Sequence, residues 1–101
     1  MEGVEKLPVH DALIKSIDLD WPESILVIHL SAFIEKGRSA TPCKLTFTGV
    51  TDISVPHKSP WGDSNSINGI EAEPNGYSIE IQSGDKILVE ALGYTFESTN
   101  L

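Results

Sequence analysis

The sequence predicts an all-β fold, an antiparallel β-sandwich or partly open barrel of about six to seven short strands, formed by a single domain over residues 1–101. Three observations predict it. Apolar and polar residues alternate with a period of two along much of the chain. Glycine, proline and asparagine separate these stretches at short intervals. A chain of 101 residues with 40% hydrophobic residues is large enough for one core.

The first two alternating stretches predict a hairpin. They cover Ser16–Trp21 and Ile25–Ala32, and Trp21–Ser24 joins them with a proline at a turn position. The second stretch begins with apolar residues on both faces, which is typical of a central strand between two layers. A short helix over Ala12–Ile17, capped by Asp11, is an alternative.

A polar loop and a third strand follow. The loop is predicted over Glu35–Pro42, where glycine and proline interrupt the pattern, and the strand over Cys43–Val50. Gly49 indicates a bulge, after which the alternation resumes at Ile53 and Val55. No internal repeat is visible in the residues.

The second half of the chain predicts two further hairpins after the irregular segment His57–Asn68. Its alternating stretches are Ile70–Glu73, Tyr77–Gln82 and Ile87–Ala91, with Tyr94 and Phe96 extending the last strand past Gly93. Pro74–Gly76 and Ser83–Asp85 are expected to be the turns, because asparagine and glycine tolerate the positive φ that tight turns require.

The charge balance is acidic. The chain has 15 acidic and 7 basic residues and a formal net charge of −8. This argues against binding to a nucleic-acid backbone and to anionic membrane surfaces, since both require clustered lysine and arginine. Residues 59–101 hold seven acidic residues and a single base, Lys86. Such a surface serves solubility or binds a basic protein partner.

The predicted partner-binding residues lie in this acidic half. If Asn75-Gly76 joins a hairpin, Glu71 or Glu73 lies near Glu80 on one solvent face. Trp61 and Asp63 join this set from the irregular segment. Trp61 has proline and glycine neighbours, so it either covers the open end of the core or contacts a partner, a role in which tryptophan is common.

The chemistry-bearing residues do not form a recognisable catalytic pattern. His10, His29 and His57 are 19 and 28 residues apart, and Cys43 is the single cysteine. These spacings predict no metal site, no cofactor and no internal disulfide. His29 is expected to be half-buried and satisfied by a neighbour. Ser83-Gly84-Asp85 is interpreted as a turn rather than as part of a serine site.

The expected location is the cytoplasm. Residues 1–7 show no secretory signal, and the most apolar run, Ile25–Ile28, is much shorter than a membrane-spanning helix. A lone cysteine suits a reducing compartment.

Four motifs occur in a recognisable order: His10-Asp11-Ala12-Leu13, Phe47-Thr48-Gly49-Val50, a Pro-Trp-Gly-x-Ser-x-x-Ile loop over Pro60–Ile67, and Ile-Glu-x-Gln-Ser-Gly-Asp over Ile79–Asp85. In this layout the chain resembles a group of small bacterial all-β proteins. Some members are grouped with the immunity proteins of toxin systems, and others have no assigned role. The resemblance implies a fold and carries over no catalytic residue.

The leading hypothesis is a non-enzymatic binding protein that docks an acidic face on a basic partner, with an immunity-type inhibitor of a basic toxin as its most specific form. Two alternatives remain at this point. One is a small-molecule-binding or enzymatic domain that uses His10, Asp11 and the His57–Asp63 region. The other is a protein that self-associates through unpaired strand edges.

Overall fold

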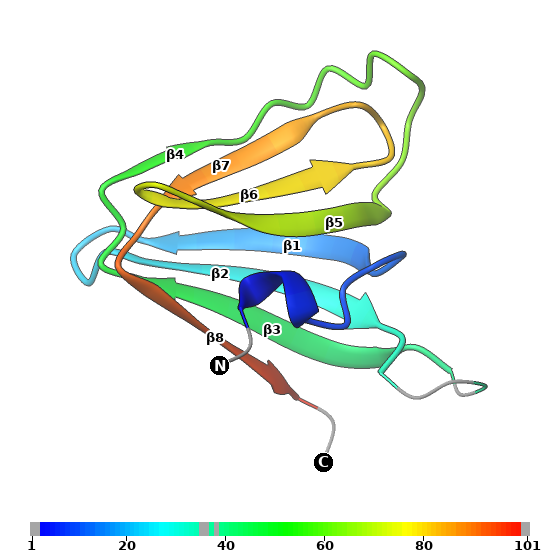
Figure 1. The fold of residues 1–101 in the computed structure, drawn as a ribbon, viewed down its shortest axis with the longest axis horizontal. Coiled ribbons are helices and arrows are strands. Elements are labelled where there is room, and N and C mark those ends of the chain that lie inside the picture. Colours follow the sequence, from blue (N-terminus) through cyan, green and yellow to red (C-terminus); the bar gives the residue numbers. More distant parts are fainter. Residues whose placement is uncertain (1–2, 35–36, 38, 100–101) are drawn as a thin grey trace.

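Two antiparallel sheets pack face to face, as the computed structural model shows for residues 3–34, 37 and 39–99 (Figure 1). Sheet A has the strand order β1-β2-β3-β8, and sheet B has the order β4-β7-β6-β5. The elements are η1 (Val4–Lys6), β1 (Leu13–Asp20), β2 (Ile25–Ala32), β3 (Thr41–Thr48), β4 (Asp52–Ser54), β5 (Ile67–Glu73), β6 (Gly76–Ile81), β7 (Lys86–Glu90) and β8 (Gly93–Ser98). The predicted all-β sandwich is confirmed, with eight strands in the described residues rather than six or seven.

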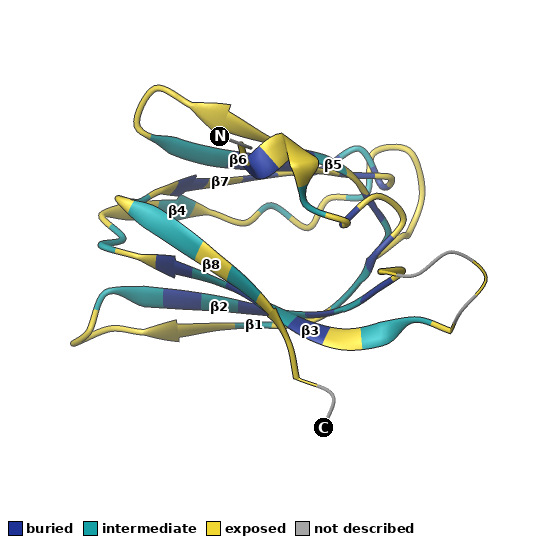
Figure 2. Cartoon of the chain, turned by 60° about the horizontal axis from the view of Figure 1, so that its bottom comes forward, coloured by how far each residue is buried: buried dark blue, intermediate teal, exposed yellow. Residues whose placement is uncertain are grey.

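The core lies between the sheets and is supplied by alternate residues of the inner strands (Figure 2). Every second residue of β2 is buried and the others are half-buried, so β2 is an inner strand of sheet A with one face on the core. It does not lie between two layers, contrary to the prediction from its apolar start. Phe47 on β3, Tyr77 on β6 and Tyr94 on β8 join the two sheets through ring contacts with centroid distances of 5.2 and 5.4 Å. Removing these apolar groups from water is the main stabilising term of such a fold.

The chain changes sheet at two places where the sequence predicts one continuing strand. Gly49 has a φ of +64° and directs the chain out of sheet A, so β4 pairs with β7 in sheet B. The expected bulge at Gly49 is therefore wrong. The predicted extension past Gly93 is also wrong, because β8 returns to sheet A and pairs with β3. Period-two alternation does not reveal which sheet a strand joins.

The structure also differs from the sequence-based expectations at β1 and at the turn between β5 and β6. β1 begins at Leu13, so the alternative helix over Ala12–Ile17 does not form, and Trp21 lies outside the strand. In the turn between β5 and β6, Pro74 and Asn75 are the central residues and Gly76 already belongs to β6. Gly76 does not have a positive φ. A Cβ at this position would collide with the Val89 carbonyl oxygen, so close strand approach requires this glycine.

The polar loop predicted over Glu35–Pro42 lies partly outside the described residues. Thr41 and Pro42 already belong to β3.

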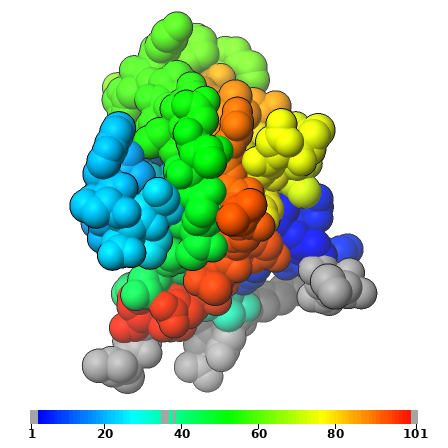
Figure 3. Space-filling model, turned by 90° about the vertical axis from the view of Figure 1, so that its left-hand side faces the viewer, coloured from blue at the N-terminus to red at the C-terminus, as the bar shows by residue number. Residues whose placement is uncertain are grey.

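The two halves of the chain repeat one topology, contrary to the sequence-based expectation of no repeat. Each half forms a three-stranded meander and contributes its fourth strand to the sheet of the other half. Backbone hydrogen bonds in the first half have counterparts in the second half. At the crossovers, Thr51 N–H donates to Glu90 O and its counterpart Leu92 N–H donates to Thr48 O, while Val50 N–H donates to Ser24 O and its counterpart Ala91 N–H donates to Asn75 O. At the starts of β1 and β5, Ile14 N–H donates to Asn65 O and its counterpart Ile67 N–H donates to Ala12 O. Figure 3 shows the two crossover segments side by side, with the β1–β2 turn on one side and the β5–β6 turn on the other.

This arrangement is an internal pseudo-two-fold symmetry. Strands β1 to β4 correspond to β5 to β8, and both β1 and β5 have a register shift near their starts. The repeat is not visible as a regular spacing in the sequence, because the turns and loops differ in length between the two halves.

Candidate functional site

The outer face of sheet B gathers the acidic side chains of four strands. Strand pairing and alternation place five carboxylates there, which we call the acidic face: Asp52, Glu71, Glu73, Glu80 and Glu90. Lys86 lies on the same face, opposite Glu80 on the neighbouring strand. The predicted residues Glu71, Glu73 and Glu80 are all exposed and share this face. Asp52 was missed because its membership depends on the crossover into β4. Glu90 lies on β7, which pairs with β6 as predicted, so strand alternation could have placed it on this face.

Like charges lie close together on the acidic face. Asp52 is the direct cross-strand partner of Glu90. Glu80 pairs with Gly69, two residues before Glu71, so Glu71 and Glu80 are diagonal neighbours on one face. Direct opposition of like charges destabilises a sheet. The centre of the face carries no charge, because the paired residues there are the exposed Leu88 and the buried Ser78. The Ser78 hydroxyl donates to Glu73 Oε2 at 2.8 Å.

Trp61 stands at one end of the acidic face. Its side chain is 76% exposed, so it does not cover the open end of the core, and the covering role considered from the sequence is wrong. Trp61 lines a shallow depression of about 220 Å³ together with Glu80 and Lys86. The predicted set therefore has an aromatic residue beside its carboxylates. Asp63 is exposed in the same loop.

The Ser83–Asp85 turn holds this loop in place. The buried Asp85 carboxylate accepts hydrogen bonds from the backbone N–H groups of Lys58 and Ser59, both at 2.9 Å. The Ser83 hydroxyl donates to the same carboxylate at 2.8 Å, and the Trp61 N–H donates to the Ser83 carbonyl. The interpretation of Ser83-Gly84-Asp85 as a turn is confirmed, and its serine and aspartate have structural partners.

The pKa of Asp85 is lowered below its ordinary value, and the hydrogen bond from the Lys58 N–H is the largest cause. The Ser59 N–H, the Ser83 hydroxyl and the nearby His57 lower this pKa further. Burial alone would raise this pKa, but the donors outweigh it because they stabilise the ionised form. The carboxylate is therefore a charged anchor for the loop.

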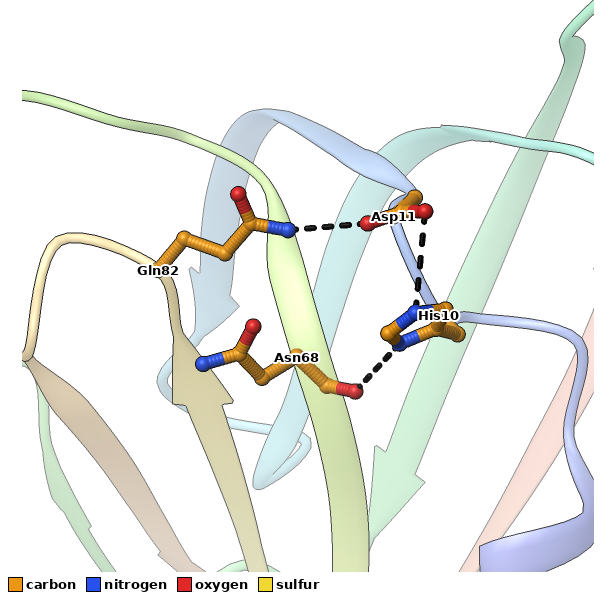
Figure 4. A network of polar contacts seen from close by, with 4 residues as sticks. All are labelled: His10, Asp11, Asn68 and Gln82. Atoms are coloured by element: carbon orange, nitrogen blue, oxygen red, sulfur yellow. Dashed lines mark hydrogen bonds and ion pairs between the residues drawn. The ribbon is translucent and has the colours of Figure 1, made fainter.

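His10 and Asp11 lie at a corner where the N-terminal segment meets β5 and β6 (Figure 4). The His10 ring Nδ1 lies 2.8 Å from the Asn68 carbonyl oxygen, and its Nε2 lies 3.6 Å from Asp11 Oδ2. Gln82 donates to Asp11 Oδ1 at 2.8 Å. Figure 4 shows these side chains linking three segments. Both His10 and Asp11 are exposed, so the network joins elements at the surface rather than lining an enclosed cavity.

The remaining chemistry-bearing residues are separate from that corner. His29 lies on β2 and its Nε2 is 2.9 Å from Asp18 Oδ2, which confirms the half-buried histidine with a neighbouring partner. Cys43 is buried on β3, and burial raises the pKa of its thiol, which disfavours the reactive thiolate. Within residues 3–34, 37 and 39–99, no three His, Cys, Asp or Glu side chains are placed to hold a metal ion.

Comparison with family models, curated proteins and solved structures finds no match to this chain. In the part of the chain that the structure describes, there is no helix with the length and apolar character needed to span a membrane.

Proposed function

We propose that this protein is a non-enzymatic binding protein whose acidic face docks on a basic protein partner. The observation that carries the proposal is the collection of five carboxylates on one face of sheet B, with Asp52 directly opposite Glu90. Such an arrangement costs stability in the free protein. A cationic partner offsets that cost by neutralising the face.

The composition of the face supports docking as well as solubility. Leu88 gives its centre an apolar contact, and Trp61 provides an exposed aromatic side chain at one end. Interfaces commonly combine such aromatic anchors with surrounding charge. An acidic rim around these groups steers a basic partner during diffusion and raises the association rate.

The most specific form of this function is an immunity-type inhibitor that covers the basic cleft of a toxin acting on nucleic acid. The support for this form is the net charge of −8 and the group that the sequence layout resembles. Proteins that act on nucleic acid carry lysine and arginine near their substrate, and the acidic face presents complementary charge.

Charge reversal tests the acidic face. The Glu71→Lys/Glu80→Lys variant should fold normally and capture less of the partner from native lysate at low salt. The loss should come from a slower on-rate with a weaker salt dependence, because distant charges are screened as ionic strength rises. Binding kinetics with the captured protein, measured at low and moderate salt, provide the readout.

A matched control separates the face from net charge. Asp18→Lys/Glu97→Lys changes the net charge equally but alters sheet A, where these residues contact His29 and Lys44. It should retain capture more fully than the Glu71/Glu80 variant. Equal capture by the wild type and both variants would contradict the proposal, as would equal losses in both variants.

A further inference from the structure

One open side of the sandwich, between β5 and β8, is covered by the chain itself. η1 lies there, beside β5, as Figure 2 shows. Val4 and Val9 of this N-terminal segment are buried in the core, and Leu7 packs against it. The segment also bonds to the edge of β5, because Glu5 Oε2 accepts from the Ala72 N–H and Ile67 accepts from the Asp11 N–H.

The pseudo-two-fold symmetry relates this covered side to the side between β1 and β4. Strand registers make Leu19 on β1 the equivalent of Ala72 on β5. β4 is likewise the equivalent of β8. A hollow of about 460 Å³ lies at this second side, at the C-terminal end of β1. The described residues that line it are Leu19, Trp21, Ser24, Val50, Thr51, Asp52 and Ile53.

The hollow presents apolar and aromatic surface to solvent. Trp21 is 81% exposed, and Leu19 and the neighbouring Val55 are exposed as well. On the covered side, Val4 and Val9 of the N-terminal segment are buried in the core beside β5, and a second hollow with an exposed Leu92 remains at the end of that strand. Exposed aromatic and aliphatic groups around a hollow are typical of surfaces that receive another chain.

The charge around the hollow indicates what kind of segment it accepts. Asp52 lines it, and Asp20 and Glu23 flank Trp21 in the adjoining turn. The N-terminal segment of a second copy would bring Glu5 toward these carboxylates, so charge disfavours self-docking. A segment with lysine or arginine at this end is complementary, and Trp21 can also contact such a cation through its ring.

We propose that the side between β1 and β4 binds an extended segment of a partner protein, with apolar residues spaced as Val4, Leu7 and Val9 are and with basic residues at its N-terminal end. The segment lies along β1 as residues 3–9 lie along β5, because the places equivalent to Asp11 and Ala12 are held by Asn65, which bonds to the N–H and the carbonyl oxygen of Ile14. In that orientation its N-terminal end meets Trp21, Asp20 and Asp52. This site shares only Asp52 with the acidic face, and the variants that test the two proposals change other residues, so either proposal can fail without the other.

The probe is a synthetic peptide of three lysines followed by the sequence of residues 3–9. The protein carries Trp61→Phe, which leaves Trp21 as its single tryptophan. Titration should shift Trp21 emission to the blue in a saturable way. The peptide without lysines should bind roughly tenfold more weakly at low salt, and a peptide with both valines replaced by aspartate should not bind.

Protein variants locate the site. Asp20→Lys and Leu19→Asp should weaken binding, whereas Leu92→Ser should not, because Leu92 is 89% exposed in the hollow at the symmetry-related position. Amide NMR shifts should appear at Leu19 and Val50.

Three results would overturn the proposal. They are equal binding of the lysine-free peptide, NMR shifts confined to residues 3–12 and β5, and concentration-dependent dimers that occupy the hollow.

Discussion

Gly84 illustrates how a residue can be required both by its own turn and by contacts with a segment distant in the sequence. Gly84 has a φ of +93°, as its predicted place in a tight turn implies. A Cβ there would also lie 2.8 Å from Pro60 and from the Trp61 ring. The turn signal could be found in the sequence, but the packing of the loop against it could not, because residues 60 and 84 are distant in the chain.

Gly84→Val should lower the free energy of unfolding by about 1 kcal/mol or more, because a β-branched residue is strained at this φ and meets the loop. Urea denaturation measures the change. Gly62→Ala is the matched control, since Gly62 has a φ of +114° and open space around its Cα. It should show the backbone strain alone and a smaller loss. An unchanged midpoint for Gly84→Val would contradict the assignment.

At the scale of elements, one short turn determines where a long loop lies. The Ser83–Asp85 turn links β6 to β7 and also binds the backbone of Lys58, Ser59 and Trp61. The loop that carries Trp61 is therefore held against sheet B by a charged side chain. Sequence patterns could identify the turn residues, but the acceptor role of Asp85 toward residues 58 and 59 required the tertiary structure.

The anchoring of this loop should depend on pH. Because the folded-state pKa of Asp85 is lowered, its contribution to stability is present above the ordinary aspartate value, about 4, and is lost as pH falls through the folded pKa. Asp85→Asn should therefore reduce the thermal midpoint at neutral pH, and its difference from wild type should shrink toward acid. Melting curves from pH 7 to pH 2 test this. Asp63→Asn, in the same loop, should follow the wild type; a constant Asp85→Asn difference would contradict the mechanism.

For the whole molecule, the exchange of fourth strands makes each half depend on the other. β4 completes sheet B and β8 completes sheet A, so neither meander has its full sheet without the opposite half. The reciprocal bonds of Thr51 and Leu92 join the crossovers at one end of the sandwich. This dependence implies a single cooperative unit despite the internal symmetry.

Unfolding should accordingly follow one transition. Near-UV circular dichroism, which reports the packed Tyr77 and Tyr94 rings, and far-UV circular dichroism should give the same denaturation midpoint, because the loss of either sheet exposes the core of the other. A chain truncated after Leu92, which lacks β8, should lose strand signal from both sheets. Separate transitions, or a truncated chain that retains a folded sheet B, would contradict this account.

The sequence by itself determined the all-β class, most strand positions, the two tight turns and the acidic half of the chain. These features depend on local alternation, turn residues and composition, which a linear pattern records. The tertiary structure alone decided that β4 and β8 change sheets, that Asp52 joins the acidic face, that Trp61 is exposed, and that Trp21 borders a hollow beside β1. The physical reason is that alternation separates the two faces of a strand but does not specify its neighbour. Neighbours depend on long-range packing of the core.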